Sequence, residues 1–185
     1  LKKVPILIVD DTVIFESAVI NEYIDEAYPP TLQPEDLLLK AKNRSWVEFS
    51  NNISLYTFQL SVKEEKIDFE RVLEELLDDF DRVEEYLWAK PFFNGRQFSL
   101  VDASYAPIFQ RLHFLEQIYK PIIKKDRYPR LINWKKNLLS LKAVKESTVA
   151  EIQNLYYQLI WTRQGYISNY LSEKEYGKRQ PKKLY

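Results

Sequence analysis

The chain of 185 residues is 45% hydrophobic, which fits a globular protein with one substantial core or two small ones. Its 27 lysine and arginine residues balance 27 aspartate and glutamate residues, so no net charge favours nucleic acid or an anionic membrane as partner, and we expect neither. The lack of cysteine excludes disulfides, thiolate metal sites and a cysteine nucleophile within the chain, and the single histidine, His113, leaves little for a metal site, so we expect no metal.

Signals for export or membrane insertion are also lacking from the sequence. No apolar run approaches the ~20 residues that a membrane-spanning helix requires, and no segment resembles a signal peptide. We therefore expect a cytoplasmic protein. The sequence contains no methionine, so residue 1 is not a native start, and we expect further residues upstream of Leu1.

The first predicted element is a β hairpin. Residues 5–9 form a continuous apolar run, two aspartates and a threonine follow at 10–12, and residues 13–15 are apolar again, which predicts strand, turn and strand. A lone hairpin is marginal in water, and a continuous apolar strand needs cover on both faces, so these strands should belong to a larger sheet. The rest of the sequence is helical in pattern, and the missing strands are therefore expected upstream of Leu1 or in another chain.

A helix is predicted to begin at Ser17 and to end at the run YPPTLQP, residues 28–34. The three prolines of this run stop the helix and open a new region. We therefore place a domain boundary there, with one domain in residues 1–30 and a second in residues 31–185.

The second domain is predicted to be all-helical. Ser99 and Asp102 have the spacing of a capping box at a helix start, which makes Asp102 a buried folding element rather than a catalytic acid. Apolar periodicity predicts further helices over about residues 36–60, 69–87, 129–139 and 144–161.

Four motifs, in this order, resemble those of the cytosolic glutathione transferases. Lys3-Val4-Pro5 opens a strand, and Glu16-Ser17 stands at the head of a helix eleven residues after the proline. The segment EYIDEAYPP ends that helix, and SLVDASYAP, from Ser99, lies in the helical domain. The resemblance covers nearly all of the chain and is closest to omega-like and related bacterial members.

The resemblance implies an α/β N-terminal domain of thioredoxin-like fold followed by an all-α helical bundle. Of the first domain only the second half, a β hairpin plus a helix, would be present, and the first β-α-β portion would lie upstream of Leu1. In this family the tyrosine, serine or cysteine that acts on the glutathione sulfur sits in that portion. The catalytic residue is therefore expected upstream of residue 1, and none is assigned within the chain.

Glutathione carries an α-ammonium and an α-carboxylate at its γ-glutamyl end. Glu16 can pair with the ammonium, while the Ser17 hydroxyl and the free amides of the helix start suit the carboxylate. The alternative is that Ser17 only caps the helix and Glu16 is a favourable charge at its N-terminus. The resemblance also implies a cis Val4–Pro5 bond, with the cysteinyl part of glutathione docked on the Val4 backbone as an added strand.

Other residues have open roles. Lys3 could approach the glycyl carboxylate of glutathione or be solvated as a surface lysine. The second substrate, implied to be a small hydrophobic electrophile or a disulfide, would bind between the domains. Trp46, Phe49 and Trp161 are its candidate contacts, with Tyr56, although aromatic residues at helical spacing also build cores.

We therefore expect a glutathione S-transferase that acts as a cytoplasmic homodimer with glutathione as co-substrate. It would transfer glutathione to an electrophile, as in detoxification, or use it for thiol reduction. The alternative is a non-catalytic transferase-like protein that mediates protein–protein interaction. Glu16-Ser17 behind Val4-Pro5 favours the enzyme, since a protein that does not bind glutathione has no need of these residues.

Overall fold

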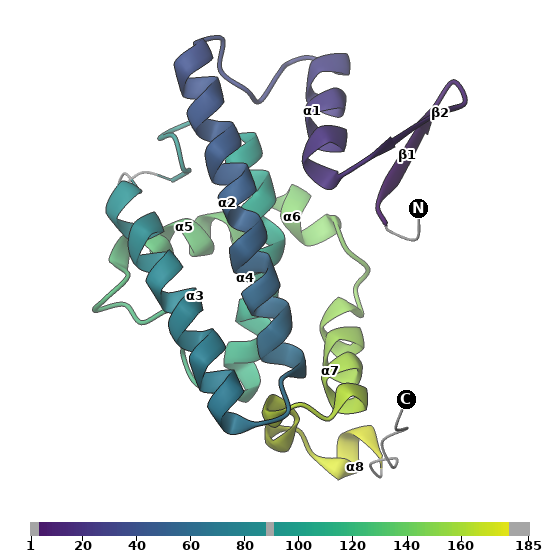
Figure 1. Ribbon diagram of the computed structural model, residues 1–185, viewed down its shortest axis with the longest axis vertical. Helices are drawn as coiled ribbons and strands as arrows, with labels where there is room; N and C mark the ends of the chain where they lie inside the picture. Colours follow the sequence, from purple (N-terminus) through teal and green to yellow (C-terminus); the bar gives the residue numbers. More distant parts are fainter. Residues whose placement is uncertain (1–3, 88–90, 178–185) are drawn as a thin grey trace.

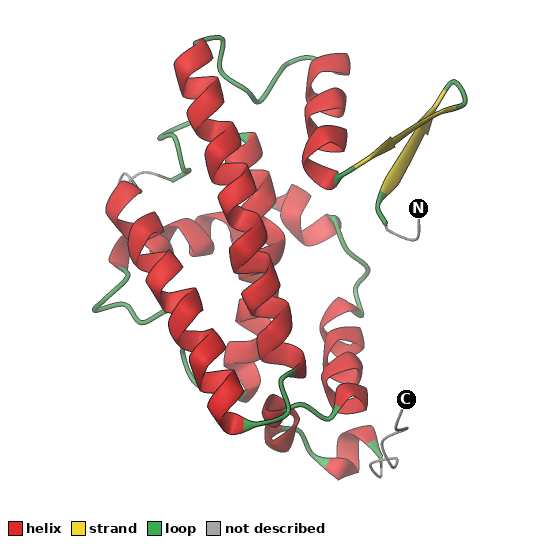
Figure 2. Cartoon of the chain, in the orientation of Figure 1, coloured by secondary structure: helices red, strands yellow, loops and turns green. Residues whose placement is uncertain are grey.

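The computed structural model describes residues 4–87 and 91–177 of the chain. A hairpin and one helix lie beside a bundle of longer helices (Figure 1). Helices form most of the regular structure in the described residues (Figure 2). Within those residues, no helix combines the length and apolarity needed to cross a bilayer. The predicted order of hairpin, helix and helical bundle is confirmed.

The hairpin consists of strand β1 (Ile6–Val9) and strand β2 (Thr12–Phe15), paired antiparallel. The two turn residues, Asp10 and Asp11, have positive φ angles of 45° and 66°. Two-residue hairpin turns of the mirror-image type need positive φ at both positions, and aspartate tolerates it better than most residues. The predicted hairpin is therefore present, with its turn at these two aspartates.

Helix α1 (Ser17–Ala27) is tied at its C-terminal end to the linker that follows. Asp25 is buried, and its carboxylate accepts hydrogen bonds from the backbone N–H groups of Leu32 at 2.6 Å and Gln33 at 3.2 Å. A buried carboxylate is stable only when donors satisfy it, and here the linker backbone supplies them. The linker therefore folds back onto the end of α1.

Two ion pairs join α1 to helix α2 (Leu37–Val62). The Glu22 carboxylate pairs with both the Nε and the Nη2 of Arg44, at 2.7 and 2.8 Å, and Glu26 pairs with Lys40 at 3.0 Å. A bidentate arginine–carboxylate pair fixes orientation as well as distance. These pairs and the Asp25 hydrogen bonds set the direction in which α1 leaves the bundle.

The bundle core forms where α2, helix α3 (Lys66–Tyr86) and helix α4 (Leu100–Ile118) pack together (Figure 1). One face of α3 is fully buried, because its apolar residues recur every three or four positions. These residues are Phe69, Val72, Leu76, Phe80 and Val83. Burying each such side chain contributes about 1.5 to 3 kcal/mol, so this face accounts for much of the packing energy of α3.

The C-terminal part contains helices α5 (Pro129–Ser140), α6 (Lys142–Glu146) and α7 (Ile152–Arg163), the 3₁₀ turn η1 (Tyr166–Tyr170) and the short helix α8 (Glu173–Tyr176). The prediction of one helix over residues 144–161 is wrong, because residues 147–151 separate α6 from α7. The Ser147 hydroxyl donates to the Val144 carbonyl at 2.8 Å. Serine competes in this way with the helical hydrogen bonds and favours a helix end.

Asp102 is the polar centre of the bundle and has no exposed surface. It forms the predicted capping box with Ser99, whose backbone N–H donates to Oδ2 at 2.8 Å. Its Oδ1 accepts from the Phe93 backbone N–H at 2.9 Å and from the Trp134 indole N–H at 2.7 Å. Asp102 therefore joins the loop before α4, α4 itself and α5, as a buried structural residue.

Candidate functional site

The first strand begins at a cis Val4–Pro5 peptide bond, the isomer that the family resemblance implied. Val4 precedes the ladder, which starts at Ile6, and it is 89% exposed. The main chain of Val4 therefore lies at an open end of the hairpin. Lys3, the first residue of this motif, lies outside the described residues.

Glu16 forms the junction between β2 and α1. Its backbone has φ 69° and ψ 119°, a positive φ that residues other than glycine rarely adopt. Such a conformation costs about 1 to 3 kcal/mol and is concentrated at functional sites. The Glu16 carbonyl accepts the first helical hydrogen bond, from the Ile20 N–H at 3.0 Å.

Ser17 is the first helical residue of α1, and Glu16 occupies the cap position. No side-chain hydrogen bond caps this helix, so the alternative in which Ser17 only caps it is not the observed geometry. Both side chains are exposed, and neither has a hydrogen-bond or ion-pair partner among the described residues. The amides of the first turn add unpaired donors and the positive end of the helix dipole.

A cavity of about 890 Å³ connects this helix start with the helical bundle. On the N-terminal side, it is lined by Val4, Pro5 and Ser17. The structure thus brings three of the five predicted glutathione contacts to one space, while Glu16, which precedes Ser17 in the sequence, is not part of the lining. The hairpin and α7 lie on the same side of α2 in Figure 1.

The bundle side of the cavity is mainly apolar. Phe58 of α2 and Leu155 and Leu159 of α7 line it, with Ser54, also of α2, as a polar neighbour. A mainly apolar wall beside a few polar groups is typical of a site for a small organic ligand. Helices α2 and α7 therefore supply the apolar wall on the bundle side of this cavity, whose other side is lined by residues of the first predicted domain.

Helix α4 contributes Gln110 and Arg111 to the same cavity. The Arg111 guanidinium is exposed and donates to the Pro107 carbonyl at 2.9 Å, and it has no ion-pair partner among the described residues. An unpaired cation at the wall of an apolar cavity attracts an anionic group of a ligand.

Tyr156 of α7 is the one phenol that the described residues place in the cavity wall. Burial raises the pKa of the Tyr156 hydroxyl to about 12, and a hydrogen bond with Ser61 at 2.5 Å lowers it only in part. The phenol is therefore protonated at neutral pH, and its hydroxyl is engaged with Ser61. This arrangement fits a structural side chain rather than one that ionises a thiol.

Two of the predicted substrate contacts, Trp46 and Phe49, do not line this cavity. The Trp46 ring packs against the rings of Phe49, Tyr86 and Phe93, with centroids 5.3, 4.7 and 5.4 Å apart. Both residues therefore lie on the face of α2 that joins the core. Large aromatic side chains gain most from such burial, so core packing decides their position.

Trp161 and Tyr56 also lie away from the cavity lining. Trp161 is buried and its ring lies 6.0 Å from that of Tyr176, while Tyr56 packs against the core. The cavity instead uses Phe58 and Leu155, which sequence reasoning missed as site residues. Their signal was the apolar stripe of each helix, which does not distinguish a core face from a cavity wall.

Two family models match the chain. The glutathione S-transferase N-terminal domain matches residues 1–26, and the glutathione S-transferase C-terminal domain matches residues 68–134. The two matches are in the order that the fold requires, the first over the hairpin and α1 and the second over the bundle.

Named relatives and solved structures agree with these matches. Glutathione S-transferase U1 of Arabidopsis thaliana is 31% identical over 150 residues, which are 78% of this chain, and the chain spans 66% of that relative's length. Glutathione S-transferase omega-1 of Sus scrofa is 36% identical over 106 residues, covering 56% of this chain and 44% of the relative. Both carry the transferase name at moderate identity.

The fold is that of solved glutathione transferases. The tau-class enzyme from mango, Mangifera indica, has a TM-score of 0.72 at 22% identity, covering 86% of this chain and 76% of its own. Rice GST1, solved in complex with glutathione, has a TM-score of 0.72 at 20% identity, covering 85% and 75%. These structures confirm the predicted thioredoxin-like half followed by an all-helical domain. The chain belongs to the glutathione S-transferase family.

Proposed function

We propose that this protein binds glutathione and transfers it to an electrophile or uses it for thiol reduction. The observation that carries the proposal is the single cavity that contains Val4 and the exposed start of α1 at Ser17 on one side and an apolar helical wall on the other. The transferase names of the relatives support it. The activity belongs to the whole protein, of whose relatives this chain spans about two thirds.

The γ-glutamyl end of glutathione would bind at the start of α1. Its carboxylate would accept from the Ser17 hydroxyl and from the amides of the first turn, where the helix dipole favours negative charge. Its ammonium would pair with Glu16, which the positive φ holds at the exit of β2. The absence of a side-chain cap on α1 supports this assignment, because the donors of the first turn stay available.

The rest of the tripeptide and the second substrate would extend across the cavity. The cysteinyl part would dock beside the Val4 main chain as an added strand. An apolar second substrate would then lie against Phe58, Leu155 and Leu159, with Arg111 close to any anionic group that it carries. Tyr156 is protonated and bonded to Ser61, so we assign no thiol-activating residue within the described part of the chain.

The test is calorimetric titration of glutathione into the protein and into Glu16→Gln, Ser17→Ala and the double variant. A hydrogen bond to a charged group contributes about 1.5 to 3 kcal/mol, so we expect Glu16→Gln to weaken binding about 10- to 100-fold. Ser17→Ala removes a donor but leaves the helix amides, and a smaller loss of about fivefold is expected. Both side chains are exposed, so the fold should tolerate these changes.

Glu35→Gln is the matched control, because Glu35 is an exposed carboxylate of the linker that does not line the cavity. It should leave glutathione affinity unchanged. Equal glutathione affinity in the unchanged protein and in the double variant would contradict the assignment of Glu16 and Ser17 to the glutathione site. Binding without turnover of any electrophile or disulfide would favour the non-catalytic alternative.

A further inference from the structure

Among the described residues, Arg111 of α4 is the one charged side chain that lines the cavity of the proposed glutathione site. The other lining side chains are apolar or carry an uncharged hydroxyl or amide. Arg111 is exposed, and its guanidinium donates to the carbonyl of Pro107, one turn earlier on α4, at 2.9 Å. A guanidinium has five N–H donors, so this bond leaves most of them for a ligand.

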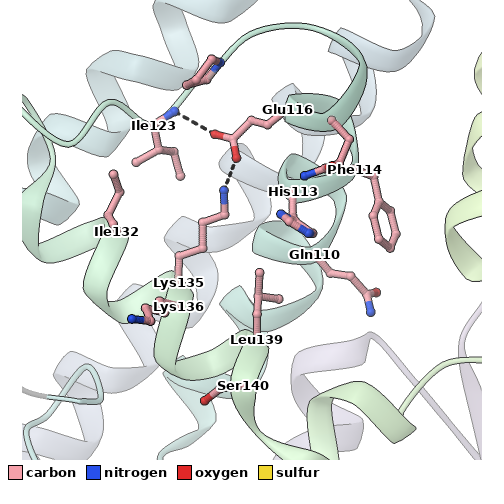
Figure 3. Close-up of a pocket in the computed structure, with 12 residues that line it drawn as sticks. Gln110, His113, Phe114, Glu116, Ile123, Ile132, Lys135, Lys136, Leu139 and Ser140 are labelled. Carbon is pink, nitrogen blue, oxygen red and sulfur yellow. Dashed lines mark hydrogen bonds and ion pairs between the residues drawn. The ribbon is translucent and has the colours of Figure 1, made fainter. Parts of the chain in front are cut away.

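No acidic residue of the surrounding helices neutralises this cation within the part of the chain that the structure describes. Helix α7 contains neither aspartate nor glutamate, and the acidic residues of α1 are engaged with the linker and α2. On α4, Asp102 is fully buried, and Glu116 points into the space between α4 and α5, where it pairs with Lys135 (Figure 3). Glu48, the acidic residue of α2, does not line the cavity. The side chains of the lining therefore carry one net positive charge.

The cation and the apolar wall lie close enough to act on one ligand. Burial raises the pKa of the Tyr156 hydroxyl on α7, and the Ser61 hydrogen bond and then the Arg111 charge act in the opposite direction. The charge on α4 therefore acts on the α7 side of the cavity. Phe58 and Leu155 of the apolar wall are 49% and 48% exposed, so an apolar body placed against them would remove further apolar surface from water.

We propose that Arg111 makes the second-substrate site selective for electrophiles that carry a carboxylate. Since this selectivity rests on the proposed function, it names the class of electrophile that the transferase prefers. The carboxylate accepts hydrogen bonds from the Arg111 guanidinium, whose planar fork matches its two oxygens. The apolar body of the electrophile lies against Phe58 and Leu155.

A chloronitrobenzoate has both features, and its reaction with glutathione is an aromatic substitution. The glutathione sulfur forms a bond to the ring carbon that carries the chlorine, the electron pair of the carbon–chlorine bond leaves with chloride, and the thiol proton goes to solvent. Arg111 takes part in none of these bond changes, because it holds the carboxylate equally in the ground state and the transition state. Such uniform binding lowers KM and leaves kcat unchanged.

Steady-state kinetics of the whole protein at saturating glutathione test the proposal, with chloronitrobenzoate compared with its neutral amide, chloronitrobenzamide. We expect Arg111→Gln to raise the KM for the benzoate about fivefold, as for a partly exposed charge pair, and to leave both the amide KM and the two kcat values unchanged. Arg111→Lys keeps the charge and should stay within about twofold of the unchanged protein. Arg96→Gln is the matched control, since Arg96 is exposed and does not line the cavity.

Titration of glutathione itself separates this proposal from the proposed function. If glutathione does not bind, the proposed function fails and the selectivity fails with it. If glutathione binds, the selectivity alone is overturned by an unchanged benzoate KM in Arg111→Gln, or by an equal rise in KM for the benzoate and the amide. Should neither compound be turned over, calorimetric titration of their two glutathione conjugates gives the same comparison. Weakening of the benzoate conjugate alone in Arg111→Gln would then support the proposal, and any other result would overturn it.

Discussion

Replacement of Asp102 by alanine should remove the acceptor that joins three parts of the bundle. The carboxylate is fully buried. It accepts hydrogen bonds of 2.7 to 2.9 Å from the backbone N–H groups of Phe93 and Ser99, from the Ser99 hydroxyl and from the Trp134 indole N–H. In Asp102→Ala all of these donors lose their partner. Ser99 can turn its hydroxyl to another acceptor, but the three N–H groups are fixed by the main chain and by the packed indole.

The expected loss follows from these three N–H groups. A buried donor left without an acceptor costs about 1 to 3 kcal/mol, so Asp102→Ala should lower the free energy of unfolding by at least about 3 kcal/mol. This is a large share of the about 5 to 15 kcal/mol that stabilises a typical domain. Asp102→Asn keeps one oxygen but turns an N–H₂ group toward donors, and about half of that loss is expected.

Urea unfolding followed by far-ultraviolet circular dichroism measures the difference. Asp126→Ala is the matched control, because Asp126 is exposed and has no hydrogen bond to the described residues, and it should change the free energy by less than about 0.5 kcal/mol. A loss below about 1 kcal/mol in Asp102→Ala would refute the reasoning, since it would mean that water or other acceptors replace the carboxylate.

Two further predictions concern close packing and pH. A Cβ at Gly165 would lie 2.9 Å from the Val62 carbonyl carbon, so Gly165→Ala should cost about 1 to 3 kcal/mol in urea unfolding, and an unchanged value would contradict the close approach. Burial raises the pKa of the Asp79 carboxyl, so the folded state binds its proton more tightly than the unfolded state. Stability should therefore rise as the pH falls through this raised pKa toward about 4. Asp79→Asn should remove that slope in thermal unfolding, while Asp126→Asn, at an exposed position whose charge does not act on Asp79, should keep the slope.

The sequence predicted those elements whose local signals agree with their packing. The apolar runs around the aspartates at 10 and 11 gave the hairpin, and the prolines from residue 29 gave the end of α1. The sequence pattern did not predict the break between α6 and α7, because the apolar period continues across it. The Ser147 hydroxyl bond to the Val144 carbonyl, three residues back, is a local alternative to the helical hydrogen bonds, and the apolar pattern does not record it.

Some residues of the candidate site could likewise be predicted from the sequence, and others could not. Val4, Pro5 and Ser17 could be placed together from the sequence because a motif with fixed spacing carries them, and they line one cavity. The residues of the apolar wall could not be placed from the sequence. Periodicity shows which residues share a helix face, but it does not show what that face contacts. Trp46 meets three other rings in the core, whereas the smaller Leu155 remains at the cavity.

The geometry of the proposed glutathione site depends on contacts at the opposite end of α1. Ser17 lies at the N-terminus of a rigid helix of 11 residues, which spans about 16 Å. Its far end is held by the Asp25 hydrogen bonds to the linker and by the bidentate pair of Glu22 with Arg44. A small rotation there is carried along the helix to the first-turn amides, and it changes their distance from the wall on α2 and α7. In the proposed site, residues that touch no ligand would therefore set where the γ-glutamyl group lies relative to the second substrate.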